Sequence, residues 1–408
     1  MASGITSQDA DRRAHNDPSS RLRNSQSGEL NRAEERFKNL VEANSEQQRK
    51  SWALAWKERG GKVIGMLDYY VPEELVYAAG MFPWRVTGTW RGSISRALAY
   101  RYTNSCLFCT HVLESLLSGE LDFLDGIIAT DWDDDMRRLW DVFEHIDKPA
   151  FRPAVHVPRA NTSVAIDFYA EDLKRLCQQL EKLSGNKVTN DALHQAIEVC
   201  NKTRVLLKRV YELRKREKPA ISGTEALGLV LASTVMPKEE FNQELESLIG
   251  FVEQREARAN SFHPRILLAS DHLDHPAYIE VVEQSALVVM DDMDTGSRYF
   301  WNQVEEDAPP FVALSDSYLN KPACPRMFFW EKQVEQVIDW AREFRCDGVL
   351  NFPQTFSFDR LQQAPYFRDR LTEVGIPVLD LTRDYSPAKL GQLQTRIQAF
   401  TEMLKETV

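Results

Sequence analysis

Short apolar runs alternate with helical patterns near the start of the chain, and this alternation predicts an α/β region. The runs predicted to be buried strands are 62–66, 82–86, 126–129 and 154–158. Between the first two runs, Pro72 and the acidic pair behind it favour the start of a helix over 73–79. Strands separated by helices are typical of a parallel sheet, so we expect a first α/β domain over 61–160.

The same alternation resumes at His263 and predicts a second α/β domain over 263–408. The expected strands are 265–270, 287–290, 347–351 and 377–381, and the expected helices are 277–284, 328–344, 365–374 and 389–405. Both regions contain a strand that opens with Asp-Gly, at Asp125-Gly126 and at Asp347-Gly348. The shared opening suggests two related halves.

The stretches outside these two regions have different patterns. Long helical patterns fill 161–262 and predict a helical segment that joins the two α/β domains. Residues 1–30 are polar and lack periodicity, so we expect a disordered tail. Residues 31–60 are charged and helical, with Trp52 and Trp56 among their few large apolar side chains. We expect this helix to dock on another surface, such as a partner subunit.

Composition narrows the class of protein. The 408 residues are 43% hydrophobic and carry a net charge of −11, which is ordinary for a globular chain and gives no pull toward nucleic acid or anionic membranes. No apolar run approaches the roughly 20 residues of a spanning helix, and no signal-like segment opens the chain. A cytoplasmic location is the default expectation. In that setting the six cysteines are expected to be buried thiols or ligands rather than disulfides.

Candidate chemistry concentrates in one unit of the first α/β region. Cys106 and Cys109 form a Cys-x-x-Cys pair at the start of a helix, and an acidic turn over 131–135 follows the strand at 126–129. Ligands of open α/β sheets gather beyond the carboxyl ends of strands, so a metal or charged-ligand site is a natural expectation here. Structural thiols and helix-capping carboxylates are the alternatives, because neither a second cysteine pair nor a thioredoxin-like spacer is present.

Other familiar signatures are missing from the sequence. There is no P-loop, no Gly-x-Gly-x-x-Gly, no His-Glu-x-x-His and no nucleophile elbow. His272 and His275 lie with Asp271 and Asp274 in one predicted loop. A solvated loop is the more common explanation for such a group than a ligand site.

Several ordered strings resemble the 2-hydroxyacyl-CoA dehydratase family, which includes the D component of 2-hydroxyglutaryl-CoA dehydratase and subunits of benzoyl-CoA reductase. The strings are KVIGMLDYYVPEELVYAAGMFPWRV, SCLFCTHVLESLLSGELDFLDGIIATDWDDDMRRLWDVF, KPACPRMFFWEKQVEQVIDWAREFRCDGVLNF, FRDRLTEVGIPVLDLTRDYS and GQLQTRIQAF. The resemblance spans roughly residues 60–402. It implies two flavodoxin-like, Rossmann-like parallel-sheet domains, a heterodimer with a related sister subunit, and an acyl-CoA thioester as substrate. It also implies one-electron ketyl chemistry, with the electron supplied by an ATP-dependent activator iron–sulfur protein.

The resemblance further implies a [4Fe-4S] cluster held by three cysteines, and this sequence departs from that pattern. Cys106 matches the first cysteine, but Asp133 stands at the second position and Ser357 at the third. Iron–sulfur clusters favour thiolate ligands, so this set is expected to bind a cluster poorly.

Three explanations stay open for the altered ligand set. The subunit has lost its cluster, or Cys106, Cys109 and Asp133 hold an altered one, or Asp133 and Asp135 hold another metal through oxygen. Glu74 matches a position common in the family and is the candidate for acid–base chemistry or for orienting the acyl-CoA, with a helix-start charge as the alternative. No nucleic-acid or membrane partner is expected.

Overall fold

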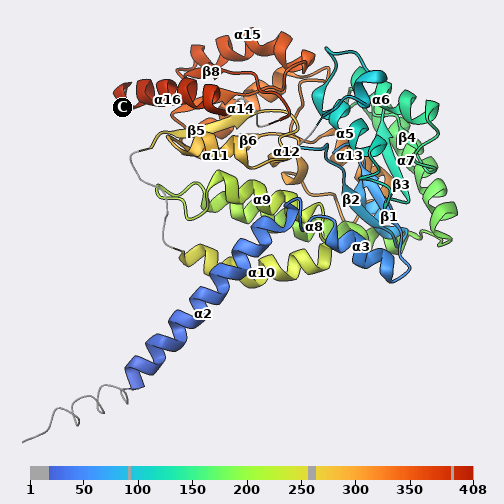
Figure 1. Ribbon diagram of the computed structural model, residues 1–408, viewed down its shortest axis with the longest axis horizontal. Helices are drawn as coiled ribbons and strands as arrows, with labels where there is room; N and C mark the ends of the chain where they lie inside the picture. The colour runs from blue at the N-terminus through green and yellow to red at the C-terminus, as the bar shows by residue number, and fades with distance from the viewer. Residues whose placement is uncertain (1–17, 91–92, 256–262, 387–389, 408) are drawn as a thin grey trace, which may run out of the picture.

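Two four-stranded parallel sheets with the same strand order form the framework of the computed structural model (Figure 1). The structure describes residues 18–90, 93–255, 263–386 and 390–407. The first sheet runs β2 (Phe82–Arg85), β1 (Val63–Met66), β3 (Gly126–Thr130) and β4 (Ala154–Val155). The second runs β6 (Leu287–Asp292), β5 (Arg265–Ala269), β7 (Gly348–Asn351) and β8 (Val378–Asp380). Both follow the flavodoxin-like order, which confirms the predicted fold class.

The sheets are parallel because each strand returns through a helix that covers one face. The helices that follow or connect the strands of the first sheet are α4 (Glu73–Ala78), α5 (Leu107–Leu117) and α6 (Asp134–His145). Around the second sheet lie α11 (Ala277–Glu283), α14 (Glu331–Glu343), α15 (Phe358–Glu373) and α16 (Leu390–Thr407). Strands β1, β3 and β7 are buried throughout, as expected for strands covered on both faces.

The repeated Asp-Gly has the same structural role in both halves. The Asp125 Oδ2 atom accepts a hydrogen bond of 2.8 Å from Val63 at the start of β1, and Asp347 Oδ2 accepts one of 2.7 Å from Arg265 at the start of β5. A Cβ atom on Gly126 would lie 2.5 Å from Phe151, so only glycine fits there. Each Asp-Gly therefore ties the third strand of its sheet to the first.

Four helices lie along the chain between the last strand of the first sheet and the first strand of the second. They are α7 (Ser163–Ser184), α8 (Asn190–Leu213), α9 (Gly223–Ser233) and α10 (Lys238–Gln254). Helix α8 contacts α4 near the first sheet and α12 (Ser297–Phe300) beside the second, so it bridges the two regions. Helix α13 (Pro310–Leu319) packs against α7 in the core that contains β1 and β3. Part of the stretch predicted as the second domain therefore packs with the first sheet.

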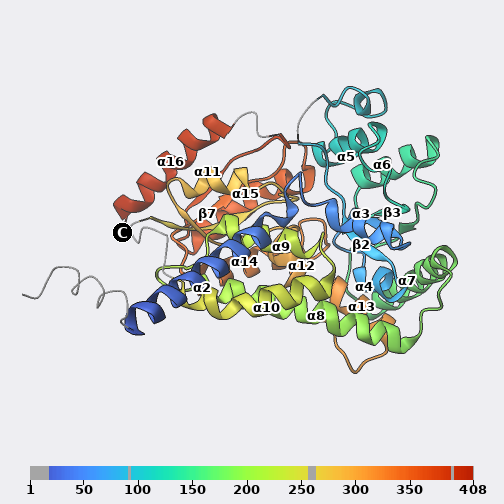
Figure 2. The same ribbon diagram turned by 60° about the horizontal axis from the view of Figure 1, so that its bottom comes forward.

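The N-terminal expectations need correction. Residues 1–17 lie outside the described residues, but helix α2 begins at Pro18 and continues to Val41, so 18–30 are not a disordered tail. The polar residues at the start of this helix carry no apolar periodicity and so gave no helix signal. A helix can nevertheless extend through them, because propagation is easier than nucleation once the other end is packed. That packed end carries Phe37 and Leu40, which are buried against this chain's own helices α9 and α10, not left for a partner (Figure 2).

The remainder of the predicted docking helix is also interrupted. A short 3₁₀ turn (Glu42–Asn44) and an irregular stretch separate α2 from α3 (Ser51–Glu58), which packs on β1 and β2. Further along the chain, α15 begins at Phe358, where we expected a start at Pro365, and α12 and α13 were not predicted. In the described residues, no helix is both long and apolar enough to cross a membrane.

Candidate functional site

The three positions that the resemblance assigns to cluster cysteines all lie at helix N-termini, where the loops of both sheets meet. Cys106 is the N-cap residue of α5, Asp133 of α6 and Ser357 of α15. Asp133 and Ser357 occupy equivalent places, since each precedes the helix that follows the third strand of its sheet. The two sheets therefore contribute matched helix ends to one region, at the carboxyl edges where ligands gather in such folds.

Cys106 is linked directly to the second α/β region. Its Sγ atom lies 3.5 Å from Oε1 of Gln354, in the loop after β7, and the same oxygen accepts a 3.1 Å bond from the backbone N–H of Phe108. The backbone N–H of Cys106 donates to Asp135 Oδ1 at 3.1 Å. Gln354 is held in turn by its backbone N–H, which donates to Asp271 Oδ2 at 2.8 Å. Gln354 therefore connects the start of α5 to the loop after β5.

Asp133 uses both carboxylate oxygens within the protein. Oδ1 accepts a 2.7 Å bond from the Met136 backbone N–H, which caps α6, and Oδ2 lies 3.0 Å from Nε of Arg326. Arg326 also lies 3.3 Å from Asp359 on α15. Burial works against the charge of Arg326, but Asp133 and neighbouring acidic groups hold the pKa of its guanidinium well above the ordinary value. A cation thus stands between the two helix ends.

Ser357 is buried but makes little use of its side chain. Its backbone N–H donates to the Gln354 carbonyl at 3.0 Å, while its hydroxyl finds no hydrogen-bond partner among the described residues and does not cap α15. The preceding residue, Phe356, has a positive φ of 68°. The hydroxyl is therefore a buried polar atom without a hydrogen-bond partner among the described residues, which is uncommon in proteins.

Two other residues connect Cys106, Asp133 and Ser357 to one interface between the two α/β regions. Gln354 touches Cys106 and Ser357, and Arg326 joins Asp133 to the first turn of α15. The donor set does not fit a [4Fe-4S] cluster, because one thiol, one carboxylate already bound to a cation and one hydroxyl replace three thiolates. Within the described residues, no group of three or more His, Cys, Asp and Glu side chains is arranged to hold a metal ion. That holds for the predicted set of Cys106, Cys109 and Asp133 as well.

Glu74, the predicted acid–base residue, lies apart from this interface in a closed ion pair. Its side chain is fully buried, with Oε1 at 2.6 Å from Arg204 of α8 and Oε2 accepting a 2.8 Å bond from the Tyr318 hydroxyl of α13. Next to it, Glu73 pairs with Lys238 at 2.9 Å. These pairs fasten α4 to three other helices. The catalytic role of Glu74 stays a prediction, and its observed contacts are structural.

The residues that organise the interface were not among those predicted from the sequence. Arg326 was part of the string KPACPRMFFW, which carries the family resemblance, but was not singled out, and Gln354 carried no signal. His272 was expected in a solvated loop, yet only 15% of its side chain is exposed and its Nδ1 lies 3.3 Å from Asp294. Burial alone would lower the pKa of His272, but Asp294 outweighs it and the pKa is raised. Only tertiary contacts reveal these roles.

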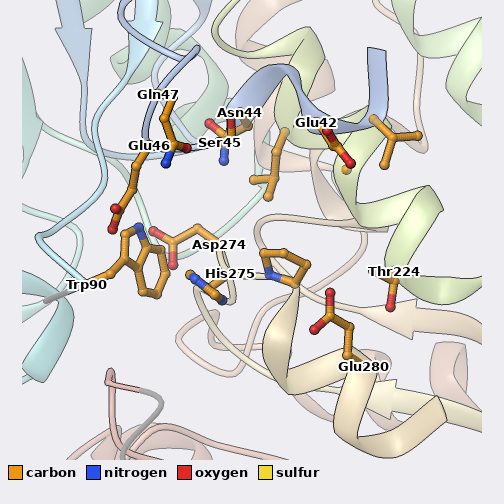
Figure 3. Close-up of a pocket in the computed structure, with 14 residues that line it drawn as sticks. Glu42, Asn44, Ser45, Glu46, Gln47, Trp90, Thr224, Asp274, His275 and Glu280 are labelled. Atoms are coloured by element: carbon orange, nitrogen blue, oxygen red, sulfur yellow. The ribbon is translucent and has the colours of Figure 1, made fainter. Parts of the chain in front are cut away.

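A pocket of about 300 Å³ opens beside the interface, between the segment after α2 and the loop after β5 (Figure 3). Asp274, His275 and the Trp90 ring lie together on one side of it, and Glu280 lies across from them. The Trp90 ring stacks on Tyr385 at 4.7 Å, and the Tyr385 hydroxyl donates to Asp274 Oδ2 at 2.7 Å. Burial raises the pKa of Asp274 to about 6.

A second pocket adjoins the first and differs in charge. It has a volume of about 280 Å³, shares Glu46 and Trp90 with the first pocket, and is lined by Arg49 and Lys50. The Arg49 side chain is buried, and burial lowers its pKa to about 10. The first pocket is therefore lined mainly by carboxylates, whereas two cations and the carboxylates of Glu46 and Glu120 line the second.

Comparison with known proteins identifies the family. The model of the 2-hydroxyglutaryl-CoA dehydratase D-component family matches residues 68–404, which is most of the chain. This chain belongs to the 2-hydroxyglutaryl-CoA dehydratase D-component family. Membership agrees with the paired flavodoxin-like sheets and with the place of Cys106 at the interface.

This chain matches several named relatives over nearly the whole length of each relative. The (R)-phenyllactyl-CoA dehydratase beta subunit of Clostridium sporogenes is 27% identical over 85% of this chain and 93% of the relative. A benzoyl-CoA reductase subunit of Thauera aromatica is 26% identical over 86% of this chain and 94% of its own. The (R)-2-hydroxyglutaryl-CoA dehydratase beta subunit of Acidaminococcus fermentans is 29% identical over 87% of this chain and 96% of the relative. All three relatives are named as subunits of enzymes.

Proposed function

We propose that this chain is the cluster-free subunit of a 2-hydroxyacyl-CoA dehydratase or benzoyl-CoA reductase type of enzyme, which acts on an acyl-CoA thioester. The observation that carries the proposal is the ion pair between Asp133 and Arg326. Asp133 stands where the family has a cysteine, and both of its oxygens are engaged, one by the α6 backbone and one by Arg326.

The energetics of this pair support a structural use of the former ligand position. Each side chain is largely shielded, with 18% of Asp133 and 12% of Arg326 exposed. Breaking such a pair by removing one partner costs several kcal/mol, because the remaining charge is left poorly solvated. Binding metal at Asp133 would require that loss, and it would place a second positive charge beside the guanidinium.

A sister subunit follows from this proposal. The one-electron chemistry that the resemblance implies is left to a related subunit that keeps the three cysteines, together with the ATP-dependent activator. The relatives are each named as one subunit of an enzyme, which agrees with a heteromeric assembly. This chain would complete the complex and contribute to the binding of the acyl-CoA.

The pair of pockets offers a place for the coenzyme. The phosphate groups of CoA need cationic neighbours, and Arg49 and Lys50 line the second pocket, where they offset the carboxylates of Glu46 and Glu120. The first pocket, with Glu42, Asp274 and Glu280, would repel phosphate groups. We therefore propose that the CoA phosphates enter beside Arg49 and that Trp90 provides a stacking surface next to them.

The decisive experiment is anaerobic reconstitution of the full-length chain with ferrous iron and sulfide. The wild-type chain is expected to keep no iron after desalting, whereas Asp133→Cys/Ser357→Cys is expected to keep iron because three thiolates are restored. Asp134→Cys/Ser357→Cys is the matched control, since Asp134 is exposed and caps nothing. Stoichiometric iron in the wild-type chain would contradict the proposal, as would an iron-free double variant.

A purely accessory subunit without contact to substrate is the second candidate, favoured by the closed ion pairs at Glu74. Thermal unfolding with and without benzoyl-CoA separates the two candidates. If this chain binds the coenzyme, the transition should shift upward, and Arg49→Gln should reduce the shift. An unchanged transition in both proteins would favour the accessory role.

A further inference from the structure

We propose that the first pocket, between the segment after α2 and the loop after β5, binds a linear diamine or polyamine in its protonated form. This pocket is shown in Figure 3, and its volume of about 300 Å³ lies at the lower end of the range for small-molecule sites. The proposal does not rest on the proposed function, because neither iron nor acyl-CoA takes part in it.

The lining of the pocket carries negative charge from three separate segments of the chain. Glu42 and Glu46 follow α2, Asp274 lies in the loop after β5, and Glu280 lies on α11. Neither lysine nor arginine is among the described residues that line the pocket. The exposed Lys38 lies 3.8 Å from Glu42, and an exposed pair of this kind offsets little charge. The lining therefore favours a positively charged ligand.

A buried oxygen of Asp274 indicates where such a ligand would bind. Asp274 is 4% exposed, and its Oδ2 atom already accepts the hydrogen bond from the Tyr385 hydroxyl. Its Oδ1 atom is buried without a hydrogen-bond partner among the described residues. Most buried polar atoms in proteins have a partner. Oδ1 is therefore the oxygen that an ammonium N–H would meet in this wall of the pocket.

The charge balance around Asp274 supports the same ligand. Burial raises the pKa of Asp274 to about 6, although the Tyr385 hydroxyl and the nearby His272, Arg383 and Arg49 oppose the rise. The cations within the protein thus do not fully offset the burial of this carboxylate. An ammonium group beside Oδ1 would stabilise the ionised form further.

His275 and Trp90 line the pocket without adding positive charge. The Nδ1 atom of His275 accepts a 3.2 Å bond from the backbone N–H of Ala277, so this nitrogen carries no proton and the ring is neutral. The Trp90 ring contacts the His275 ring at 4.6 Å and stacks on Tyr385 at 4.7 Å. Together with Leu231, Trp90 gives the pocket an apolar surface for the methylene groups of a ligand.

The placement of the carboxylates favours a ligand with more than one positive end. In the part of the chain that the structure describes, no three His, Cys, Asp or Glu side chains are grouped to hold a metal ion. Glu280 instead lies across the pocket from Asp274 and Trp90 (Figure 3). A single ammonium group can meet one of these two walls. A diamine can meet both and place its methylene chain between them.

Both sides of the pocket are fixed without a ligand. A Cβ atom on Gly228 of α9 would lie 2.6 Å from Val41 Cγ1, so the end of α2 packs directly on that helix. The loop after β5 is held by Thr295, whose Oγ1 atom accepts from the Leu273 N–H at 3.0 Å and donates to the Leu273 carbonyl at 2.7 Å. A preformed site loses little conformational entropy when a ligand binds.

The test titrates the full-length chain with 1,4-diaminobutane by isothermal calorimetry at low ionic strength, with n-butylamine as the single-charge control. We expect one diamine to bind per chain. Butylamine should bind at least roughly tenfold more weakly, because it engages one wall only. Equal affinity for the two amines would overturn the proposal, as would no binding of the diamine or several equivalent sites per chain.

Two substitutions locate the site. Asp274→Asn should weaken diamine binding at least roughly tenfold, since it removes the charge and keeps the shape of the side chain. Glu280→Gln should weaken binding by a smaller factor, because Glu280 is exposed. Asp134→Asn is the matched control, since it removes the same charge from a residue that is 81% exposed and lies outside the pocket, and it should bind the diamine as wild type does.

The variant at the surface keeps the test valid if Asp274→Asn alters folding. Diamine binding that neither Asp274→Asn nor Glu280→Gln weakens would overturn the proposal, as would an equal loss in Asp134→Asn. These titrations contain neither iron nor benzoyl-CoA, so their failure would leave the measurements that test the proposed function unaffected.

Discussion

The N-termini of α6 and α15 hold equivalent places in the two sheets, yet they use their first residue differently. Asp133 caps α6 and forms an ion pair with Arg326, whereas Ser357 leaves its helix uncapped and its hydroxyl without a partner in the described structure. Each residue stands at a position to which the family resemblance assigns a cysteine ligand. Of these two positions, one has a structural role in this chain and the other has none in the described structure.

Charge explains the difference. A carboxylate at a helix N-terminus gains from the helix dipole and from a nearby guanidinium, so Asp133 stabilises the interface on its own. A hydroxyl has no net charge, and that of Ser357 neither caps α15 nor finds another hydrogen-bond partner in the described structure. The comparison therefore predicts opposite consequences for removing the two side chains.

The largest effect is expected from Asp133→Ala. The variant loses the cap of α6 and leaves the mostly buried Arg326 with Asp359 as its remaining carboxylate partner, at 3.3 Å. We expect the free energy of unfolding to fall by about 3 kcal/mol. Urea unfolding would measure it, with Asp134→Ala as control because Asp134 is 81% exposed. Equal stability of the two variants would remove the contrast with Ser357.

The second-largest effect is expected from the carboxyl group of Asp274, in the loop after β5. Burial raises the pKa of Asp274 from 3.8 to about 6, so the folded state holds the proton more tightly than the unfolded state. The stability from this proton is present below pH 4 and is lost as the pH rises through 6. Asp274→Asn should therefore gain stability over wild type between pH 4 and 7, on the order of 2 kcal/mol. Parallel curves for the two proteins would contradict the shift.

A smaller effect tests the equivalence of the two halves. Asp125 and Asp347 each accept one bond from the first N–H of a neighbouring strand. Asp125→Ala and Asp347→Ala should each lower the free energy of unfolding by about 1 kcal/mol. The Asp125 variant should lose slightly more, because Lys57 lies 2.9 Å from the carboxylate. A large effect at only one position would mean that the repeat does not have the same role in both sheets.

The smallest effect, with the opposite sign to that at Asp133, is expected from Ser357→Ala. Removing a buried hydroxyl without a partner costs no hydrogen bond within the described protein, so stability should be unchanged or higher by roughly 0.5 kcal/mol. Guanidinium unfolding of this variant beside Asp133→Ala gives the sharpest test. A clear loss of stability would mean that the Ser357 hydroxyl does bind something in solution.

Much of the fold was available from local sequence. Apolar runs of strand length, Gly and Pro breaks and the repeated Asp-Gly predicted the eight strands in nearly their observed places. The beginning of α2 was missed because its polar residues carry no periodic pattern, and α15 was begun too late because Pro365 was taken as its first residue. Pro365 instead lies inside that helix. Boundaries without an apolar signal depend on packing elsewhere.

The sequence by itself determined the alternation of strands and helices and the family, since both are encoded in neighbouring residues. It also predicted that Asp133 and Ser357 stand at two positions that the family resemblance assigns to cysteines. The tertiary structure decided what these two residues contact. Arg326 and Gln354 come from distant parts of the chain, and their effect on Asp133 and Cys106 depends on burial and on a few ångströms of separation. Desolvation and charge act through space, and no local pattern records them.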